Sequence, residues 1–157
     1  MFVPVALWQL LTTCAPRVAP LTMSALVAYE SGARPYAIDD DSAGRAYFPR
    51  SRADAERLAA ELLAAGHNID VGYAQINSSN FATFGLDVHS AFDPCRNVAA
   101  GGALLLSAYA AAIRRYGAQP PPLAHALSAY NSGSQTGALD YARGVFSLGR
   151  TLRVQLP

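Results

Sequence analysis

Apolar residues recur at helical spacing in several segments of the sequence, and most of these segments end at glycine or proline. The pattern predicts a mostly helical chain, with helices at residues 2–11, 21–29, 51–65, 78–84, 95–116, 123–130 and about 137–148. The segment 95–116 is the longest and is apolar nearly all round, and its neighbouring Gly101 and Gly102 permit close helix contact. We therefore expect it to be the central buried helix, with a role in the core and none in the chemistry.

Local signals define the ends of two of these helices. Ser51 is placed to cap the helix 51–65, with Asp54 at the capping-box position, and Arg57 and Glu61 are spaced to form an ion pair. An Asp-Pro pair at residues 93–94 provides the N-cap and first residue of the central helix. Both helices are expected to be structural.

One acidic residue stands at the end of an apolar helix. The helix 21–29, with Thr22 as its predicted N-cap, carries Glu30 in its last turn before Gly32 ends it. The helix dipole disfavours a carboxylate there by about 0.3–1 kcal/mol, and apolar neighbours would add a desolvation cost to the charged form. Both effects raise the carboxyl pKa, as a general acid requires, although a solvated glutamate at a fraying helix end has the same sequence pattern.

The polar stretch at residues 33–50 shows neither helical nor strand periodicity and is expected to be a long loop. It holds three arginines, three aromatic residues that favour an ordered loop, and the run Asp39, Asp40 and Asp41. The simplest interpretation of the aspartate run is a solvated turn.

Two further segments carry polar groups that suit a ligand. In residues 68–77, Gly72 allows close approach, and Gln75 has both a donor and an acceptor for an N-acetyl or hydroxyl group. A proline break at residues 120–122 precedes the helix that leads to Tyr130 and Asn131, which either face a cleft or cap that helix. Neither segment is specific on its own.

Length and composition limit the classes of function. With 157 residues, 52% hydrophobic and 15% charged, the chain is expected to form a single domain over residues 1–157. A net charge of +1 indicates neither nucleic acid nor an anionic membrane as partner. All twelve basic residues are arginine, a composition that suits carboxylate recognition but is equally explained by codon bias. No histidine pair has metal-ligand spacing, no glycine-rich loop follows a strand and no serine elbow is present, so we expect neither metal nor cofactor.

The apolar segment 2–11 is too short to span a bilayer, and no Lys or Arg precedes Arg17, so the positive region of a signal peptide is missing. It stays open whether a leader has been removed, and the segment itself is expected to pack on the core through Val5, Leu7, Trp8, Leu10 and Leu11.

Cys14 and Cys95 are the only cysteines in the sequence. Two cysteines permit one disulfide or, in a reducing compartment, two thiols, and they exclude an all-cysteine zinc site.

Three short motifs, in order along the chain, resemble those of the family 23 lytic transglycosylases. They are Glu30-Ser31, Gly72-Tyr73-Ala74-Gln75-Ile76 and Ala129-Tyr130-Asn131-Ser132-Gly133, where the family has Glu-Ser, Gly-Leu-Met-Gln-Ile and Ala-Tyr-Asn-Ala-Gly. Tyr73-Ala74 thus replaces the usual Leu-Met. The Cys14-Ala15-Pro16 start, the stretch 68–77 and Asp93-Pro94-Cys95 further resemble the specialised members that accompany type IV secretion and conjugation systems.

The resemblance implies a lysozyme-like, mostly helical α+β domain with a long active-site loop and at most a short β-hairpin. It implies cleavage of peptidoglycan between N-acetylmuramic acid and N-acetylglucosamine without water, giving a 1,6-anhydro product. Glu30 would be the catalytic residue, first as acid and then as base. The residues that would bind substrate or line the cleft are Ser31, Gly72, Tyr73, Gln75, Tyr130, Asn131 and Tyr141, of which the last also matches a tyrosine that bonds the glutamate.

By the same resemblance the protein would work in the periplasm, as a monomer without a membrane span, on peptidoglycan glycan strands. It would open the wall locally for a secretion or conjugation apparatus, whose components would be further partners. In that compartment Cys14 should be bonded to Cys95.

Two rival classes of function stay open. A hydrolase would use Asp39, Asp40 or Asp41 as the base for water, because ordinary glycosidases need two carboxylates. A non-catalytic wall-binding or assembly module would keep the cleft without turnover.

Overall fold

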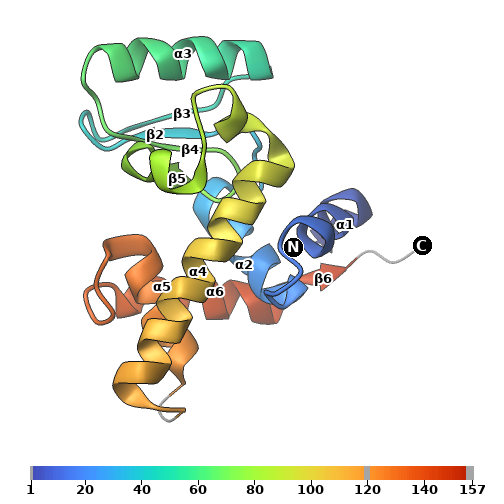
Figure 1. Ribbon diagram of the computed structural model, residues 1–157. Coiled ribbons are helices and arrows are strands. Elements are labelled where there is room, and N and C mark those ends of the chain that lie inside the picture. Colours follow the sequence, from blue (N-terminus) through green and yellow to red (C-terminus); the bar gives the residue numbers. More distant parts are fainter. Residues whose placement is uncertain (1, 119–120, 155–157) are drawn as a thin grey trace. The chain divides into compact units, whose positions relative to one another are not determined.

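The chain folds into two compact units, and the computed structural model describes residues 2–118 and 121–154 of it (Figure 1). The terminal unit comprises Met1–Tyr29 and Gly102–Pro157, and the central unit comprises Glu30–Gly101. Helices α2 (Pro20–Ser31) and α4 (Pro94–Tyr116) contribute residues to both units. That residues 1–157 form a single domain stays a prediction.

The terminal unit is helical apart from one pair of very short strands. Helices α5 and α6 pack against each other, and β1 runs parallel to β6. Apolar side chains of α2, α5 and α6 form a buried core that includes Met23, Leu26, Leu127 and Val145. The complete elements of this unit are β1 (Phe2–Val3), α1 (Val5–Cys14), α5 (Pro122–Ser132), α6 (Leu139–Thr151) and β6 (Arg153–Val154).

Gly102 in α4 makes the close helix contact that the sequence predicts. A Cβ atom at this position would lie 2.9 Å from the Cβ of Ala15, which is closer than two such atoms can approach. The chain after α1 therefore packs directly on the α4 backbone. In α1 itself, Leu11 is fully buried, whereas the other apolar residues expected to pack on the core are half-buried: Val5, Leu7, Trp8 and Leu10.

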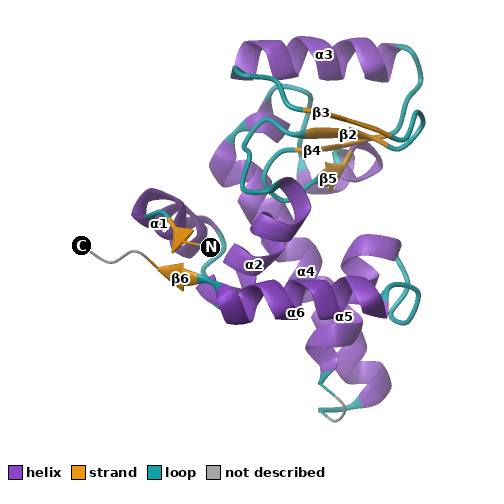
Figure 2. Cartoon of the chain, turned by 180° about the vertical axis from the view of Figure 1, so that it is seen from behind, coloured by secondary structure: helices purple, strands orange, loops and turns teal. Residues whose placement is uncertain are grey.

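The central unit contains a four-stranded antiparallel sheet in the order β3-β2-β4-β5 (Figure 2). Its strands are β2 (Ile38–Asp40), β3 (Arg45–Tyr47), β4 (Ile69–Val71) and β5 (Ile76–Asn77), and α3 (Arg52–Ala64) lies alongside them. Three short 3₁₀ turns complete this unit: η1 (Ser78–Asn80), η2 (Ala82–Phe84) and η3 (Ser90–Phe92).

The strand register sorts side chains into apolar and polar rows. Ile38, Val71 and Ile76 lie in one row across β2, β4 and β5, and all three are buried. Asp39, Asp70 and Asn77 form the adjacent row. Because successive side chains of a strand point to opposite faces, this second row lies on the polar face of the sheet.

Local capping chemistry confirms two of the predicted helix starts, those of α3 and α4. The hydroxyl of Ser51 accepts a hydrogen bond from the backbone N–H of Asp54 (3.1 Å), and Arg57 pairs with Glu61 (3.5 Å). At the start of α4, the carboxylate of Asp93 accepts a hydrogen bond from the backbone N–H of Arg96 (2.9 Å).

Several expectations were wrong in detail. The stretch 33–50 is not one long loop, since it contains β2 and β3, and residues 78–84 form two 3₁₀ turns and not one helix. Thr22 is not an N-cap, because α2 begins two residues earlier, at Pro20. Strands of two or three residues are too short to show a period, which explains why the expectation was at most a short β-hairpin although the sheet has four strands. The proline break at 120–122 lies partly outside the described residues.

Both cysteines, Cys14 and Cys95, are disulfide-bonded, as the resemblance implied. Among the described residues, α4 is the single helix long and apolar enough to cross a membrane. That criterion uses length and composition only, and the core helix of a soluble protein also meets it.

Candidate active site

Glu30 lies in the last turn of α2, as the sequence predicts. Helix α2 ends at Ser31, and its last turn contains no basic residue. Glu30 is half-buried, and Gly32 follows the helix with a positive φ of 60°. The carboxyl group therefore stands at the negative end of the helix dipole, and its raised pKa stays a prediction.

Ser31 connects the end of α2 to the second motif. Its hydroxyl donates to the backbone oxygen of Tyr73 (2.9 Å) and accepts from the backbone N–H of Arg34 (3.3 Å). Ser31 is only 4% exposed, so this hydroxyl serves the protein's own structure. The bond brings the first two motifs, Glu30-Ser31 and residues 72–76, together within the central unit.

The turn between β4 and β5 presents Gln75 in an unusual backbone conformation. Gln75 has a positive φ of 46°, which is rare outside glycine. Its side-chain nitrogen donates to the backbone oxygens of Gly72 (2.8 Å) and Ala37 (3.3 Å). The side-chain oxygen has no hydrogen-bond partner among the described residues, so it is the atom of this amide that remains open to a substrate N–H or O–H.

Asn97 holds the same turn from inside α4, and its role could not be recognised in the sequence. Its side-chain oxygen accepts from the backbone N–H of Ala74 (2.8 Å), and its nitrogen donates to the oxygens of Val71 and Ala91 (both 2.9 Å). A Cβ atom at Gly72 would lie 2.4 Å from that nitrogen. Gly72 is therefore required both by its φ of 78° and by the space that the Asn97 amide fills.

Tyr73 lies in the same turn, between the buried Gly72 and Ala74. It is half-buried, and burial raises the pKa of its phenol, with a smaller contribution from Tyr36. Tyr73 therefore stays neutral and can donate a hydrogen bond.

Asp70 is a perturbed carboxyl group that sequence reasoning missed. It lies between Asp39 and Asn77 in the polar row of the sheet. Burial, followed by the charges of Asp41 and Asp39, raises its pKa to about 7 against the opposing hydrogen bond from Asn77. The pKa of Asp70 therefore lies near neutral pH, well above that of an ordinary aspartate.

The three aspartates of the predicted solvated turn have different environments, so that interpretation was wrong for Asp40. Asp39 and Asp41 are exposed, whereas Asp40 is fully buried and hydrogen-bonded to His67 (2.8 Å). Burial opposes ionisation of Asp40, but His67 and the backbone N–H groups of Ala43 and Ser42 outweigh it and lower its pKa. Asp40 thus stabilises the β2–β3 turn and is not accessible to a substrate.

The third motif and Tyr141 belong to the terminal unit. Tyr130 is half-buried and Asn131 is exposed in the last turn of α5, which is followed by Gly133 with a φ of 70°. Tyr141 in α6 makes an edge-to-face ring contact with Tyr29, at a centroid distance of 5.1 Å. The structure thus groups Glu30, Ser31, Gly72, Tyr73 and Gln75 in one unit and Tyr130, Asn131 and Tyr141 in the other.

Comparison with protein families matches most of this chain to one family model. Residues 10–142 match the model of the transglycosylase SLT domain, and this stretch contains every predicted site residue. The chain belongs to the transglycosylase SLT domain family. Together with the helical architecture and the small sheet, the match confirms the predicted lysozyme-like α+β fold.

Curated relatives of this transglycosylase domain share one name. The chain is 38% identical to "Protein virB1" of Agrobacterium fabrum over 123 residues, which are 78% of this chain and 50% of that protein. It is 40% identical to "Type IV secretion system protein virB1" of Brucella abortus over 125 residues, 79% of this chain and 52% of that protein. The chain thus spans about half the length of the curated relatives it matches. No solved structure matches the chain.

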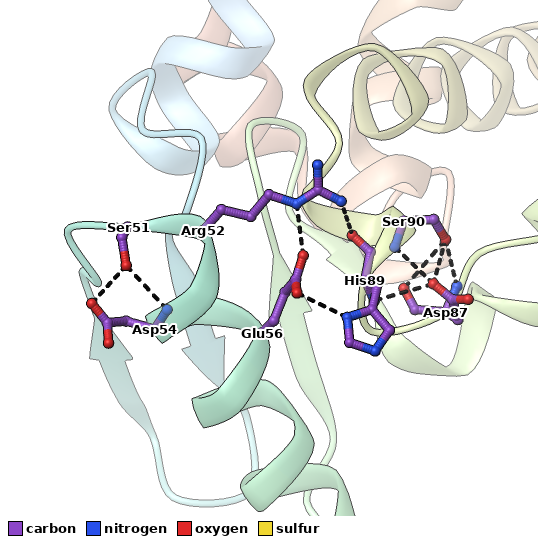
Figure 3. Close-up of polar contacts among 7 residues, drawn as sticks. All are labelled: Ser51, Arg52, Asp54, Glu56, Asp87, His89 and Ser90. Carbon is purple, nitrogen blue, oxygen red and sulfur yellow. Dashed lines mark hydrogen bonds and ion pairs between the residues drawn. The ribbon is translucent and has the colours of Figure 1, made fainter.

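A polar cluster on α3 of the transglycosylase domain has a structural explanation (Figure 3). Arg52 bonds the carboxylate of Glu56 (2.6 Å) and the backbone oxygen of His89 (2.9 Å), and the His89 ring bonds Glu56 (2.8 Å). The pKa of Glu56 is lowered by His89 first and by Arg52 second. These bonds attach α3 to the segment before η3. Among the described residues, no three or more His, Cys, Asp or Glu side chains are grouped so that they could hold a metal ion.

Proposed function

We propose that the protein is a peptidoglycan lytic transglycosylase with Glu30 as its catalytic residue. The observation that carries the proposal is the position of Glu30 within the family match. Glu30 lies in the last turn of α2, next to Ser31, whose hydroxyl bonds the Tyr73 backbone oxygen in the Gly72–Gln75 turn. A half-buried carboxyl group beside an ordered amide-bearing turn suits acid–base chemistry on an N-acetylated sugar.

The reaction proceeds in two proton transfers through one carboxyl group. Glu30 first gives its proton to the glycosidic oxygen, and the bond from that oxygen to the anomeric carbon of the muramoyl residue breaks. The 6-hydroxyl oxygen of the same residue then bonds to the anomeric carbon, and its proton returns to Glu30. The products are a new sugar 4-hydroxyl end and a 1,6-anhydromuramoyl end, and no water is consumed.

The remaining motif residues position the substrate. In the central unit, the free side-chain oxygen of Gln75 accepts a hydrogen bond from a substrate acetamido group, and Tyr73 contacts the glycan; in the terminal unit, Tyr130 contacts the glycan. In the terminal unit, Asn131 bonds a hydroxyl or acetamido group of the substrate, and Tyr141 packs edge-to-face on Tyr29. Ser31 and Gly72 act indirectly, because their contacts lie within the protein.

A hydrolase is the second candidate, and the observation that favours it is Asp70. Its raised pKa distinguishes this carboxyl group from the exposed Asp39 and Asp41, which remain candidates for activating water, whereas Asp40 is buried and paired with His67. A base must be ionised, so hydrolysis through Asp70 would increase as the pH rises through about 7.

The cellular setting follows from the relatives. The Brucella relative is named a type IV secretion system protein, and the disulfide fits an oxidising compartment. We therefore place this protein in the periplasm, as a monomer that opens the cell wall for a secretion apparatus.

The decisive experiment combines product analysis with Glu30→Gln. Mass spectrometry of digested peptidoglycan should detect 1,6-anhydromuramoyl ends from the wild type. Glutamine keeps the shape of the protonated acid but transfers no proton, so the rate should fall at least about 10³-fold while glycan binding persists.

Glu61→Gln is the matched control, since it makes the same chemical change at an exposed residue of α3. It should cleave at the wild-type rate. Reducing muramic acid as the main product would assign the enzyme to the hydrolases, and near-normal cleavage by Glu30→Gln would remove Glu30 from the mechanism.

A further inference from the structure

Three arginines of the central unit lack an acidic partner among the residues that the structure describes. Within the same ranges, the side chains of Arg34, Arg45 and Arg50 form no hydrogen bond or ion pair. The other three arginines of this unit are engaged, with contacts to Glu56, Asp54 and the Gly85 backbone: Arg52, Arg57 and Arg96. All three unpaired arginines come from the stretch 33–50, for which the proposed mechanism has no use.

A shortage of acidic groups does not explain why these three arginines have no ion-pair partner in the described part of the chain. The central unit has ten acidic residues and six arginines, a formal net charge of −4. Arg45 even lies opposite Asp40 in the strand register, but the Asp40 carboxylate is committed to His67. The arginines are therefore kept unpaired within an acidic unit.

Two of these arginines stack on aromatic rings. The guanidinium carbon of Arg34 lies 4.6 Å from the centre of the Phe48 ring, and that of Arg45 lies 4.8 Å from the centre of the Tyr47 ring. Phe48 is 56% exposed, which is unusual for so large an apolar side chain. Cation–π stacking holds a guanidinium group in place without using its N–H donors, which remain available to a planar anion.

The two aromatic rings on which these arginines stack line one hollow, together with Arg50. Tyr47, Phe48 and Arg50 line a cavity of about 390 Å³, together with Pro49, Leu58 and the ion-paired Asp54 and Arg57. Arg34 stacks on the Phe48 ring and Arg45 stacks on the Tyr47 ring, so both arginines lie next to residues that line this cavity. We call the five residues Arg34, Arg45, Tyr47, Phe48 and Arg50 the arginine–aromatic hollow.

We propose that the arginine–aromatic hollow binds a carboxylate of the peptide attached to peptidoglycan glycan strands. This inference rests on the proposed function for its substrate. The sugar rings need only an aromatic surface, whereas three guanidinium groups without an ion pair among the described residues offer positive charge and N–H donors that suit an anion. Arginine binds carboxylate through two parallel N–H···O bonds, and the Phe48 and Tyr47 rings would cover the apolar parts of the peptide.

The test measures binding to insoluble peptidoglycan in the Glu30→Gln background, where the polymer stays intact. Native sacculi, the intact peptidoglycan shells of cells, are compared with amidated sacculi. In the amidated sacculi, carbodiimide and ammonium have converted the free carboxylates to uncharged carboxamides. Arg45→Gln and Arg50→Gln should each raise the dissociation constant on native sacculi about threefold to tenfold, and Arg50→Glu should raise it further. None of the three should change binding to amidated sacculi, which the parent protein itself should bind more weakly than native sacculi.

Arg114→Gln is the matched control, because it removes the same charge from an exposed residue in the last turn of α4. It should bind both polymers like the parent. Equal binding of the parent to native and amidated sacculi, or an equal loss by the arginine variants on both, overturns the inference. The proposed function is tested separately by the 1,6-anhydro product, so carboxylate-dependent binding without that product would refute only the function.

Discussion

Replacing Gly72 with alanine tests whether Asn97 determines the shape of the candidate active-site turn. The added methyl group would lie 2.4 Å from the Asn97 nitrogen and 2.7 Å from its side-chain carbonyl carbon. Since Asn97 is only 1% exposed and is held by three hydrogen bonds, it has no space to move without breaking them. Either Asn97 or the turn must therefore shift.

Two costs add up in this variant. Alanine at a φ of 78° costs about 1–2 kcal/mol for the left-handed backbone conformation. Displacing the Asn97 amide leaves buried partners unsatisfied, at about 1–3 kcal/mol for each lost bond. Losing one or two of the three bonds brings the total to about 4 kcal/mol, a large share of the stability of a domain of this size.

Gly66→Ala separates the two costs. Gly66 has a similar φ of 83°, but no atom lies within 4 Å of the added methyl group, so only the backbone cost of about 1–2 kcal/mol remains. Urea unfolding of both variants, with the disulfide intact, should show Gly72→Ala to be the less stable by about 2–3 kcal/mol. Equal losses in the two variants would refute the argument.

A double-variant cycle with Asn97→Ala identifies the contact responsible. Once the amide is removed, the additional cost of Gly72→Ala should fall to that of Gly66→Ala. A cost that stays the same in both backgrounds would show that the methyl group does not act through Asn97.

Two further predictions concern Asp70 and Ser51. The pKa of Asp70 is raised from 3.8 to about 7 by folding, so the folded state binds more protons between these values, and the free energy of unfolding falls as the pH rises through this range. Asp70→Asn should flatten this fall and raise the free energy of unfolding at pH 8 by up to about 4 kcal/mol in urea titrations; an unchanged pH profile would contradict the perturbed carboxyl group. Ser51→Ala removes the cap that accepts from the Asp54 backbone and should cost about 1 kcal/mol in thermal unfolding, and an unchanged melting temperature would mean that the cap contributes nothing.

The sequence by itself determined most of the helices, the capped starts of α3 and α4, and the three motifs. Helix ends depend on groups within a few residues of each other, such as Ser51 with Asp54 or Asp93 with Arg96, so local patterns predict them. The order Glu30-Ser31, residues 72–76 and residues 129–133 is likewise a property of the chain alone, and these motifs are sufficient to identify the family.

Tertiary structure alone decided how the polar groups are used. Asp39, Asp40 and Asp41 are identical in sequence terms, but the strand register buries Asp40 and leaves its neighbours exposed. Asn97 has the sequence context of an ordinary helical residue, yet its amide holds a turn formed more than twenty positions earlier. A carboxyl pKa, the partners of an amide and the stacking of an arginine on a ring all depend on charges and burial from distant segments, which no local pattern contains.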